Sequence, residues 1–111
     1  MSMACDALAE RIRELLPDTG RITEKKMFGG IAFMQDGHML VCPTKEGSLI
    51  VRVGKEGLAK ALLSPGAGVM EMGGRSMGGF VVVSGDAIEE EFALGEWLDR
   101  ARAFVATLPA K

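Results

Sequence analysis

Hydrophobic positions change their spacing along the chain, from a helical period to a period of two and back again. Near the start, Leu8, Ile12 and Leu15 recur at intervals of three to four residues, with charged side chains between them. This spacing gathers apolar side chains on one side of a helix. It predicts a helix over 2–16, ended by the turn-forming residues 17–20.

The middle of the chain alternates at every second position, which is typical of strands. The ranges 31–34, 39–42 and 49–53 follow this pattern. Asp36-Gly37 between the first two is a strong hairpin signal, because glycine accepts the positive φ of a tight turn. The polar segment 21–28 that precedes them predicts at most a short edge strand.

The rest of the chain predicts a helix over 55–63, strands over 69–72 and 80–83, and a glycine-rich connector over 73–79 between these strands. A last helix is expected from Asp86 to about 108. Asp86 and Glu89 fit a reciprocal cap of its first turn. Its buried stripe is expected to consist of Ile88, Phe92, Leu98, Ala101, Val105 and Leu108.

The predicted order is therefore α-β(3)-α-β(2)-α, with a possible extra edge strand before the first hairpin. Hairpins imply antiparallel pairing, so the fold class is α+β, a two-layer sandwich with helices on one face of an antiparallel sheet. At 111 residues, one domain over 1–111 is expected.

Both faces of this predicted sheet are apolar. One face is expected to carry Ala32, Met34, Leu40, Cys42 and Ile50, and the other Ile31, Phe33, Met39, Val41, Leu49 and Val51. An apolar second face usually marks a partner surface. We hypothesise a homodimer that covers it, and the alternative is a terminal helix that wraps round to it.

Composition and charge narrow the function classes. The net charge is −2, which argues against direct nucleic-acid binding by the whole surface. Cys5 and Cys42 lie far apart and form no C-x-x-C pair, so we expect reduced thiols and no metal. The N-terminal stretch does not have the pattern of a signal peptide, and no apolar run approaches the roughly 20 residues that span a bilayer. We expect a cytoplasmic protein without a cofactor.

Catalytic chemistry is not expected either. The segment 74–78 reads G-R-S-M-G, the nucleophile-elbow pattern, but that chemistry requires a strand-to-helix turn and a histidine later in the chain. Here a strand follows, and the single histidine, His38, lies upstream beside the Asp36-Gly37 turn. We therefore expect no enzyme and no catalytic residues.

The candidate binding residues are Lys25, Lys26, Arg52, Gly74 and Arg75. Backbone N–H groups of the glycine-rich stretch 66–79 could cradle an anion with the help of Arg75. Arg52 lies inside a strand, on the face of Ile50, where a cation needs a partner, solvent or a ligand. The alternatives are a plain hairpin connector and scattered surface charges.

Three stretches together resemble one known family. They are K-M-F-G-G-I-A-F at 26–33, L-I-V-R-V-G at 49–54 and G-R-S-M-G-G-F-V-V-V at 74–83. In this order and spacing they are similar to the N-terminal domain of the TfoX/Sxy competence regulators. The resemblance covers nearly the whole chain. Ser76 stands where the family often has proline, and Gly78 where it often has lysine, which weakens the case for a basic nucleic-acid surface.

The resemblance implies an α-β(3)-α-β(2)-α sandwich and a role in transcription regulation through another protein. Full-length family members carry a further helical domain, for which the chain leaves no room after Lys111. We therefore expect a stand-alone regulatory domain, non-catalytic, that acts through a protein partner and forms a homodimer. Two other functions stay open: small-molecule or anion binding by the glycine-rich loop with Arg75 and Arg52, and weak nucleic-acid contact through Lys25, Lys26, Arg52 and Arg75.

The stretch 25–33, which contains the first part of the resemblance, then has a structural interpretation. Phe28 is expected to pack inward, and Gly29 and Gly30 to let the backbone bend into the strand. Only Lys25 and Lys26 remain functional candidates in it.

Overall fold

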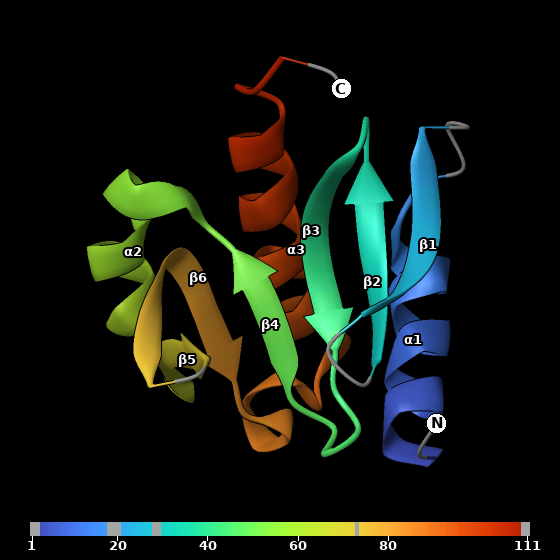
Figure 1. Cartoon of the computed structure of the whole chain (residues 1–111). Helices are drawn as coiled ribbons and strands as arrows, with labels where there is room; N and C mark the ends of the chain where they lie inside the picture. The colour runs from blue at the N-terminus through green and yellow to red at the C-terminus, as the bar shows by residue number, and fades with distance from the viewer. Residues whose placement is uncertain (1–2, 18–20, 28–29, 73, 110–111) are drawn as a thin grey trace.

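The computed structural model describes residues 3–17, 21–27, 30–72 and 74–109. Figure 1 shows the elements in chain order. They are α1 (Met3–Leu15), β1 (Ile22–Met27), β2 (Gly30–Gln35), β3 (His38–Pro43), β4 (Leu49–Arg52), α2 (Gly54–Leu62), β5 (Ala67–Met72), β6 (Arg75–Val83), the 3-10 helix η1 (Gly85–Ile88) and α3 (Glu91–Val105).

The described strands form one six-stranded sheet in the order β1-β2-β3-β4-β6-β5. Every neighbouring pair is antiparallel. Asp36 and Gly37 make the predicted hairpin turn with φ values of 53° and 85°. The α+β class is thus confirmed, and the possible edge strand exists as β1.

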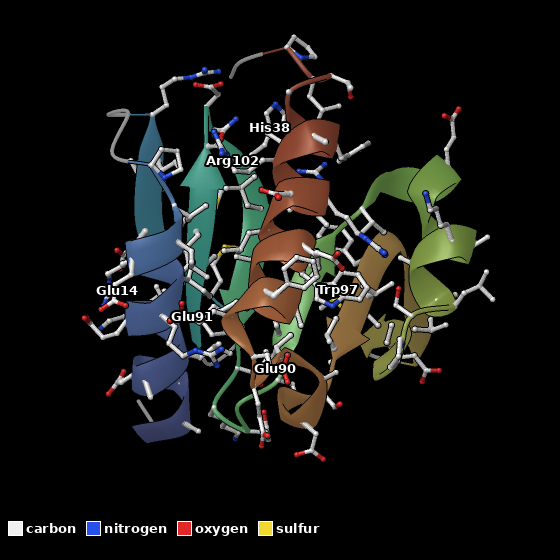
Figure 2. The ribbon with its side chains drawn as sticks, turned by 180° about the vertical axis from the view of Figure 1, so that it is seen from behind. Glu14, His38, Glu90, Glu91, Trp97 and Arg102 are labelled. Carbon is white, nitrogen blue, oxygen red and sulfur yellow. The ribbon has the colours of Figure 1, made fainter. Side chains whose placement is uncertain are left out.

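The larger core lies between the sheet and the helices. It joins buried residues of α1, α3 and the sheet, with Ala61 of α2 among them. Figure 2, seen from this side, shows α1 and α3 in front of the sheet. Trp97 of α3 points into this core and is 5% exposed. We call this side the helix side.

A smaller cluster occupies the opposite side, which we call the second face. Its buried members are Ala32, Met39, Cys42, Ile50 and Met70, and its half-buried rim is Met27, Met34, Phe80 and Val82. Among the described residues, no helix covers this cluster. The end of β1 reaches this cluster: the Cys42 thiol donates to the carbonyl oxygen of Met27 with an Sγ–O distance of 3.6 Å.

One face assignment from the alternation is wrong. Leu40 belongs to the helix-side core and Met39 to the second face, the reverse of the prediction. The register between β2 and β3 shifts at Phe33 and Met34. Such a bulge inserts an extra residue and puts two successive side chains, Leu40 and Val41, on one side.

The glycine-rich connector is shorter than predicted, because β6 already begins at Arg75. Residues 80–83 of β6 pair with β4, and its earlier residues 75 and 76 pair only with β5. The glycines of this segment favour a loop, but its pairing with β5 makes it part of strand β6.

The last helix also differs from the prediction. Residues 85–88 form η1, and α3 starts at Glu91 with no side-chain cap from Glu90, so the Asp86–Glu89 cap does not form. The break changes the helical phase. Phe92, predicted to be buried, is 76% exposed, and Leu94 takes its place in the core.

No helix in the described ranges is long and apolar enough to cross a membrane. The predicted packing of Phe28 and the bend at Gly29 lie outside the described residues.

Candidate functional site

A hollow of about 580 Å³ lies where β4 ends and α2 begins. Its walls come from residues 52–57, from residues 78–80 of β6, and from Phe104 and Thr107 at the end of α3. The volume falls within the range of about 300–1,000 Å³ that is typical of small-molecule sites. This is the candidate functional site.

Glycines let the three segments approach one another. Gly54 has a φ of +80° and begins α2, and a Cβ built there would lie 2.4 Å from the Phe104 ring. A Cβ at Gly79, with a φ of +87°, would lie 3.4 Å from the Gly54 Cα. The Val53 N–H donates to the Gly79 carbonyl oxygen at 2.8 Å, so the β4–β6 pairing continues up to the hollow.

Arg52 is the central cation of the site. It is the last residue of β4 and lies opposite Phe80 in the register. Its guanidinium carbon is 5.6 Å from the ring centroids of both Phe80 and Phe104, within the range of favourable cation–π contact. The side chain is half-buried, and no carboxylate in the described part of the chain forms an ion pair with it.

A second hollow of about 360 Å³ adjoins the first and shares Val53, Glu56, Gly57 and Phe104 with it. Together the two hollows are lined by the cations Arg52, Lys55, Lys60 and Arg100, and by the single described carboxylate Glu56. The protein as a whole has a net charge of −2. The groove between α2 and α3 is therefore locally basic on an acidic molecule.

The structure does not bring Lys25 and Lys26 to this site. Both lie on β1, three strands away from β4 in the sheet order. Lys25 pairs with Ala32 of the second face and Lys26 with Ile31 of the helix side. Side chains of paired residues share a face, so the two lysines point to opposite sides of the sheet.

Gly74 and Arg75 lie at the β5–β6 hairpin. Gly74 has a φ of +81° with open space around a built Cβ, and Arg75 pairs with Met72 at the start of β6. Arg75 precedes Phe80 by five residues, roughly 16 Å along a strand. Of the predicted binding residues whose side chains the structure describes, Arg52 lines the hollow, together with Gly78 and Gly79 of β6.

The remaining chemical candidates do not form a reactive site among the described residues. Ser76 belongs to strand β6 and not to a strand-to-helix turn. His38 is 7% exposed, and its Nε2 lies 2.7 Å from the carbonyl oxygen of Pro109. Figure 2 shows it beside Arg102, at the end of the molecule where α3 finishes. The described ranges hold no group of three potential metal ligands.

Sequence reasoning missed Lys55, Lys60 and Arg100. They come from two helices that meet only through tertiary packing. One signal was available: Lys55 directly follows the L-I-V-R-V-G stretch at 49–54. That stretch and the end of G-R-S-M-G-G-F at 74–80 line the same hollow, so two of the three stretches that carry the resemblance converge here.

A model of one protein family matches the chain. The family is described as the TfoX N-terminal domain, and the match covers residues 14–105. No curated protein and no solved structure matches the chain.

Proposed function

Because the chain belongs to the TfoX N-terminal domain family, we propose that it is a non-catalytic regulatory domain that acts by binding a protein partner. The resemblance to competence regulators supports a role in transcription regulation. The family match includes every strand of the sheet and α2 and α3. A cytoplasmic location and a homodimer are parts of the same proposal.

The observation that carries the proposal is the second face. It has an apolar cluster with a half-buried rim of Met27, Met34, Phe80 and Val82, and no described helix lies over it. Partly exposed apolar residues around a buried centre are typical of interaction surfaces. The two methionines have flexible, polarizable side chains that adapt to a partner's shape.

A second copy of the chain is the partner that we propose first. Two such faces can pack sheet on sheet, with the layers about 10 Å apart. A stable interface requires roughly 800 Å² from each partner. The centre of the second face is already buried within one chain, so the contact between copies must use the rim.

Met34→Lys tests this proposal with Phe92→Lys as the matched control. Met34 is half-buried on the second face, whereas Phe92 is a 76% exposed apolar side chain on α3. We expect sedimentation velocity at micromolar concentrations to give a dimer for the wild type and for Phe92→Lys, and a monomer for Met34→Lys. Thermal unfolding should show that both variants remain folded.

The same pair of variants identifies a regulatory partner. Proteins that co-purify with the wild type and with Phe92→Lys but not with Met34→Lys depend on the second face. A wild-type protein that is monomeric throughout, together with a set of co-purifying proteins that does not change in Met34→Lys, would contradict the proposal.

A further inference from the structure

The hollow beside α2 contains a cation that lacks an anionic partner. Arg52 contacts two aromatic rings, yet in the described ranges its guanidinium has no carboxylate within ion-pair distance. By contrast, Arg13 and Arg21 each pair with a carboxylate. The N–H donors of Arg52 therefore need solvent or a ligand, and they belong to a residue that lines a cavity.

We propose that this hollow binds a small organic anion, a carboxylate or phosphate monoester attached to an apolar body. The planar guanidinium matches the oxygen geometry of both head groups and can donate two parallel hydrogen bonds. The Phe80 and Phe104 rings restrict the guanidinium, which lowers the entropy lost on binding. Phe80 also belongs to the rim of the second face, so this site adjoins the surface that we propose for the protein partner.

The lining of the hollow selects the kind of ligand. Val53, Phe80 and Phe104 supply apolar surface, and Gly78 and Gly79 add no side chains that would fill the space. Ligand sites are typically apolar with a few placed polar groups that fix orientation. An inorganic ion would use only the cations, whereas an organic anion also buries its body against the rings.

The charge around the hollow supports an anion over a neutral molecule. Lys55 lines the same hollow, and Lys60 and Arg100 line the adjoining one, whereas Glu56 is the single carboxylate among the described lining residues. A cleft lined by an excess of one charge concentrates ions of the opposite charge. Exposed charges are screened by salt, so the affinity should fall as ionic strength rises.

Amide chemical shifts of the full chain provide the test, with phenyl phosphate as the probe. Inorganic phosphate and benzyl alcohol separate the contributions of head group and body. We expect phenyl phosphate to shift the amides of residues 52–57 and 78–80, with saturation at low millimolar concentration or below, and to bind at least about tenfold more tightly than either simpler probe.

Two charge variants have matched controls elsewhere on the molecule. Arg52→Gln should weaken phenyl phosphate binding about tenfold or more, because it removes a charge-assisted contact. Lys55→Gln, at an exposed position, should weaken it only a few-fold. Arg21→Gln and Lys25→Gln remove the same charge outside the hollow and should leave the affinity unchanged.

A steric variant keeps Arg52 and Lys55 and provides an independent test if Arg52→Gln does not fold. Gly78 needs no positive φ, and a Cβ there would meet only the Lys55 side chain, at 3.6 Å. Gly78→Val should therefore fold, occupy part of the hollow and reduce phenyl phosphate binding to the level of inorganic phosphate.

Three results would overturn the proposal. One is the absence of shifts in residues 52–57 and 78–80 with up to about 10 mM phenyl phosphate, a concentration at which even millimolar binding is visible. Another is an equal loss of affinity in Arg52→Gln and Arg21→Gln, which would indicate a general charge effect. The third is equal affinity for phenyl phosphate and inorganic phosphate, which would show that the apolar wall contributes nothing.

Discussion

Leu49 and Ile50 are neighbours in β4, but their side chains belong to the two different sides of the sheet. Leu49 is 0% exposed in the helix-side core, to which α1, α2, α3 and η1 contribute side chains. Ile50 is 4% exposed in the second-face cluster, whose members all belong to strands. Similar burial is thus reached in two ways, with a layer of helices on one side and with strand side chains alone on the other.

The low exposure of Leu49 and Ile50 therefore does not show by itself which face of the sheet can still bind a partner. On the helix side, α1 and α3 already contact the central strands β2, β3 and β4. The second face is buried at its centre and half-buried at its rim. Its rim consists of partly exposed strand residues, and such regions open locally at a lower cost than a packed layer of helices.

The largest effect on the free energy of unfolding is expected from truncating the side chains of Leu49 and Ile50. Leu49→Ala should lower the free energy of unfolding by about 3–5 kcal/mol, because its cavity lies in a densely packed core. Ile50→Ala should cost less, about 2–3 kcal/mol, because its cluster is smaller and its half-buried rim can relax into the space. Urea unfolding of both variants measures the difference. Equal losses would mean that the two sides are equally rigid.

Gly30→Ala is expected to have the next largest effect. A Cβ at Gly30 would lie 2.0 Å from the carbonyl oxygen of Pro43, a backbone atom that cannot move away alone. The β2–β3 pair must shift there, beside the end of β1, at a cost of about 2–3 kcal/mol. Gly95→Ala in α3 is the control: it meets open space, and its better helix propensity should add about 0.5–1 kcal/mol.

The two thiols belong to different clusters, Cys5 to the helix-side core and Cys42 to the second-face cluster, although both donate to the carbonyl oxygen of Pro43, at 3.5 and 3.7 Å. Burial raises the pKa of Cys42 to about 11, so in the closed state it stays protonated and unreactive at pH 8. Reaction then requires local opening. We expect iodoacetamide to modify Cys42 about tenfold faster than Cys5, a difference in opening cost of about 1.4 kcal/mol.

Peptide mass spectrometry of a native-state time course gives both rates in one sample. Gly30→Ala should speed the labelling of both thiols, because a Cβ there displaces the Pro43 carbonyl oxygen to which both thiols donate. Faster modification of Cys5 would show that the helix layer, and not the second face, is the part that opens.

The smallest effect on stability is expected from the ion pair between Arg13 of α1 and Glu24 of β1. Arg13 donates to both carboxylate oxygens of Glu24, at 2.8 and 2.6 Å, and this lowers the pKa of Glu24. A lowered pKa stabilises the fold above the pKa of the unfolded chain, and the gain is lost as the pH falls through the folded value. Stability should therefore drop below about pH 4.

Glu24→Gln should remove part of this pH dependence and cost less than about 1 kcal/mol at pH 7, since both side chains are 38% exposed. Glu14→Gln, an exposed change on α1, is the control and should leave the pH profile of thermal unfolding unchanged. An identical profile for Glu24→Gln would show that the pair contributes nothing.

Much of the fold follows from periodicity, and the differences have physical causes. The hairpin at Asp36-Gly37 and the helix before it are local, so their residues suffice to predict them. The exchange of Met39 and Leu40 depends on a bulge that no residue type announces. The exposure of Phe92 depends on a break before α3, and the Asp86–Glu89 pattern, which resembles a cap, conceals that break.

The site was less predictable than the fold. Arg52 was recognisable, because a cation inside a strand needs a partner. Its aromatic neighbours were not, since Phe80 and Phe104 reach it from a strand and a helix that are distant in the sequence. Lys25 and Lys26 are adjacent in sequence and therefore point to opposite faces of β1, and β1 lies three strands away from β4, so neither joins Arg52 in one patch.

The sheet order also has a consequence for how the molecule could come apart. Strands β1 to β4 form successive hairpins, and β5 and β6 form another, so the two units are connected within the sheet by the β4–β6 ladder alone (Figure 1). The hollow lies at the end of that ladder, between Arg52 on one unit and Phe80 on the other. An anion bound there would act as a clasp across the junction and would slow the mechanical separation of the two halves.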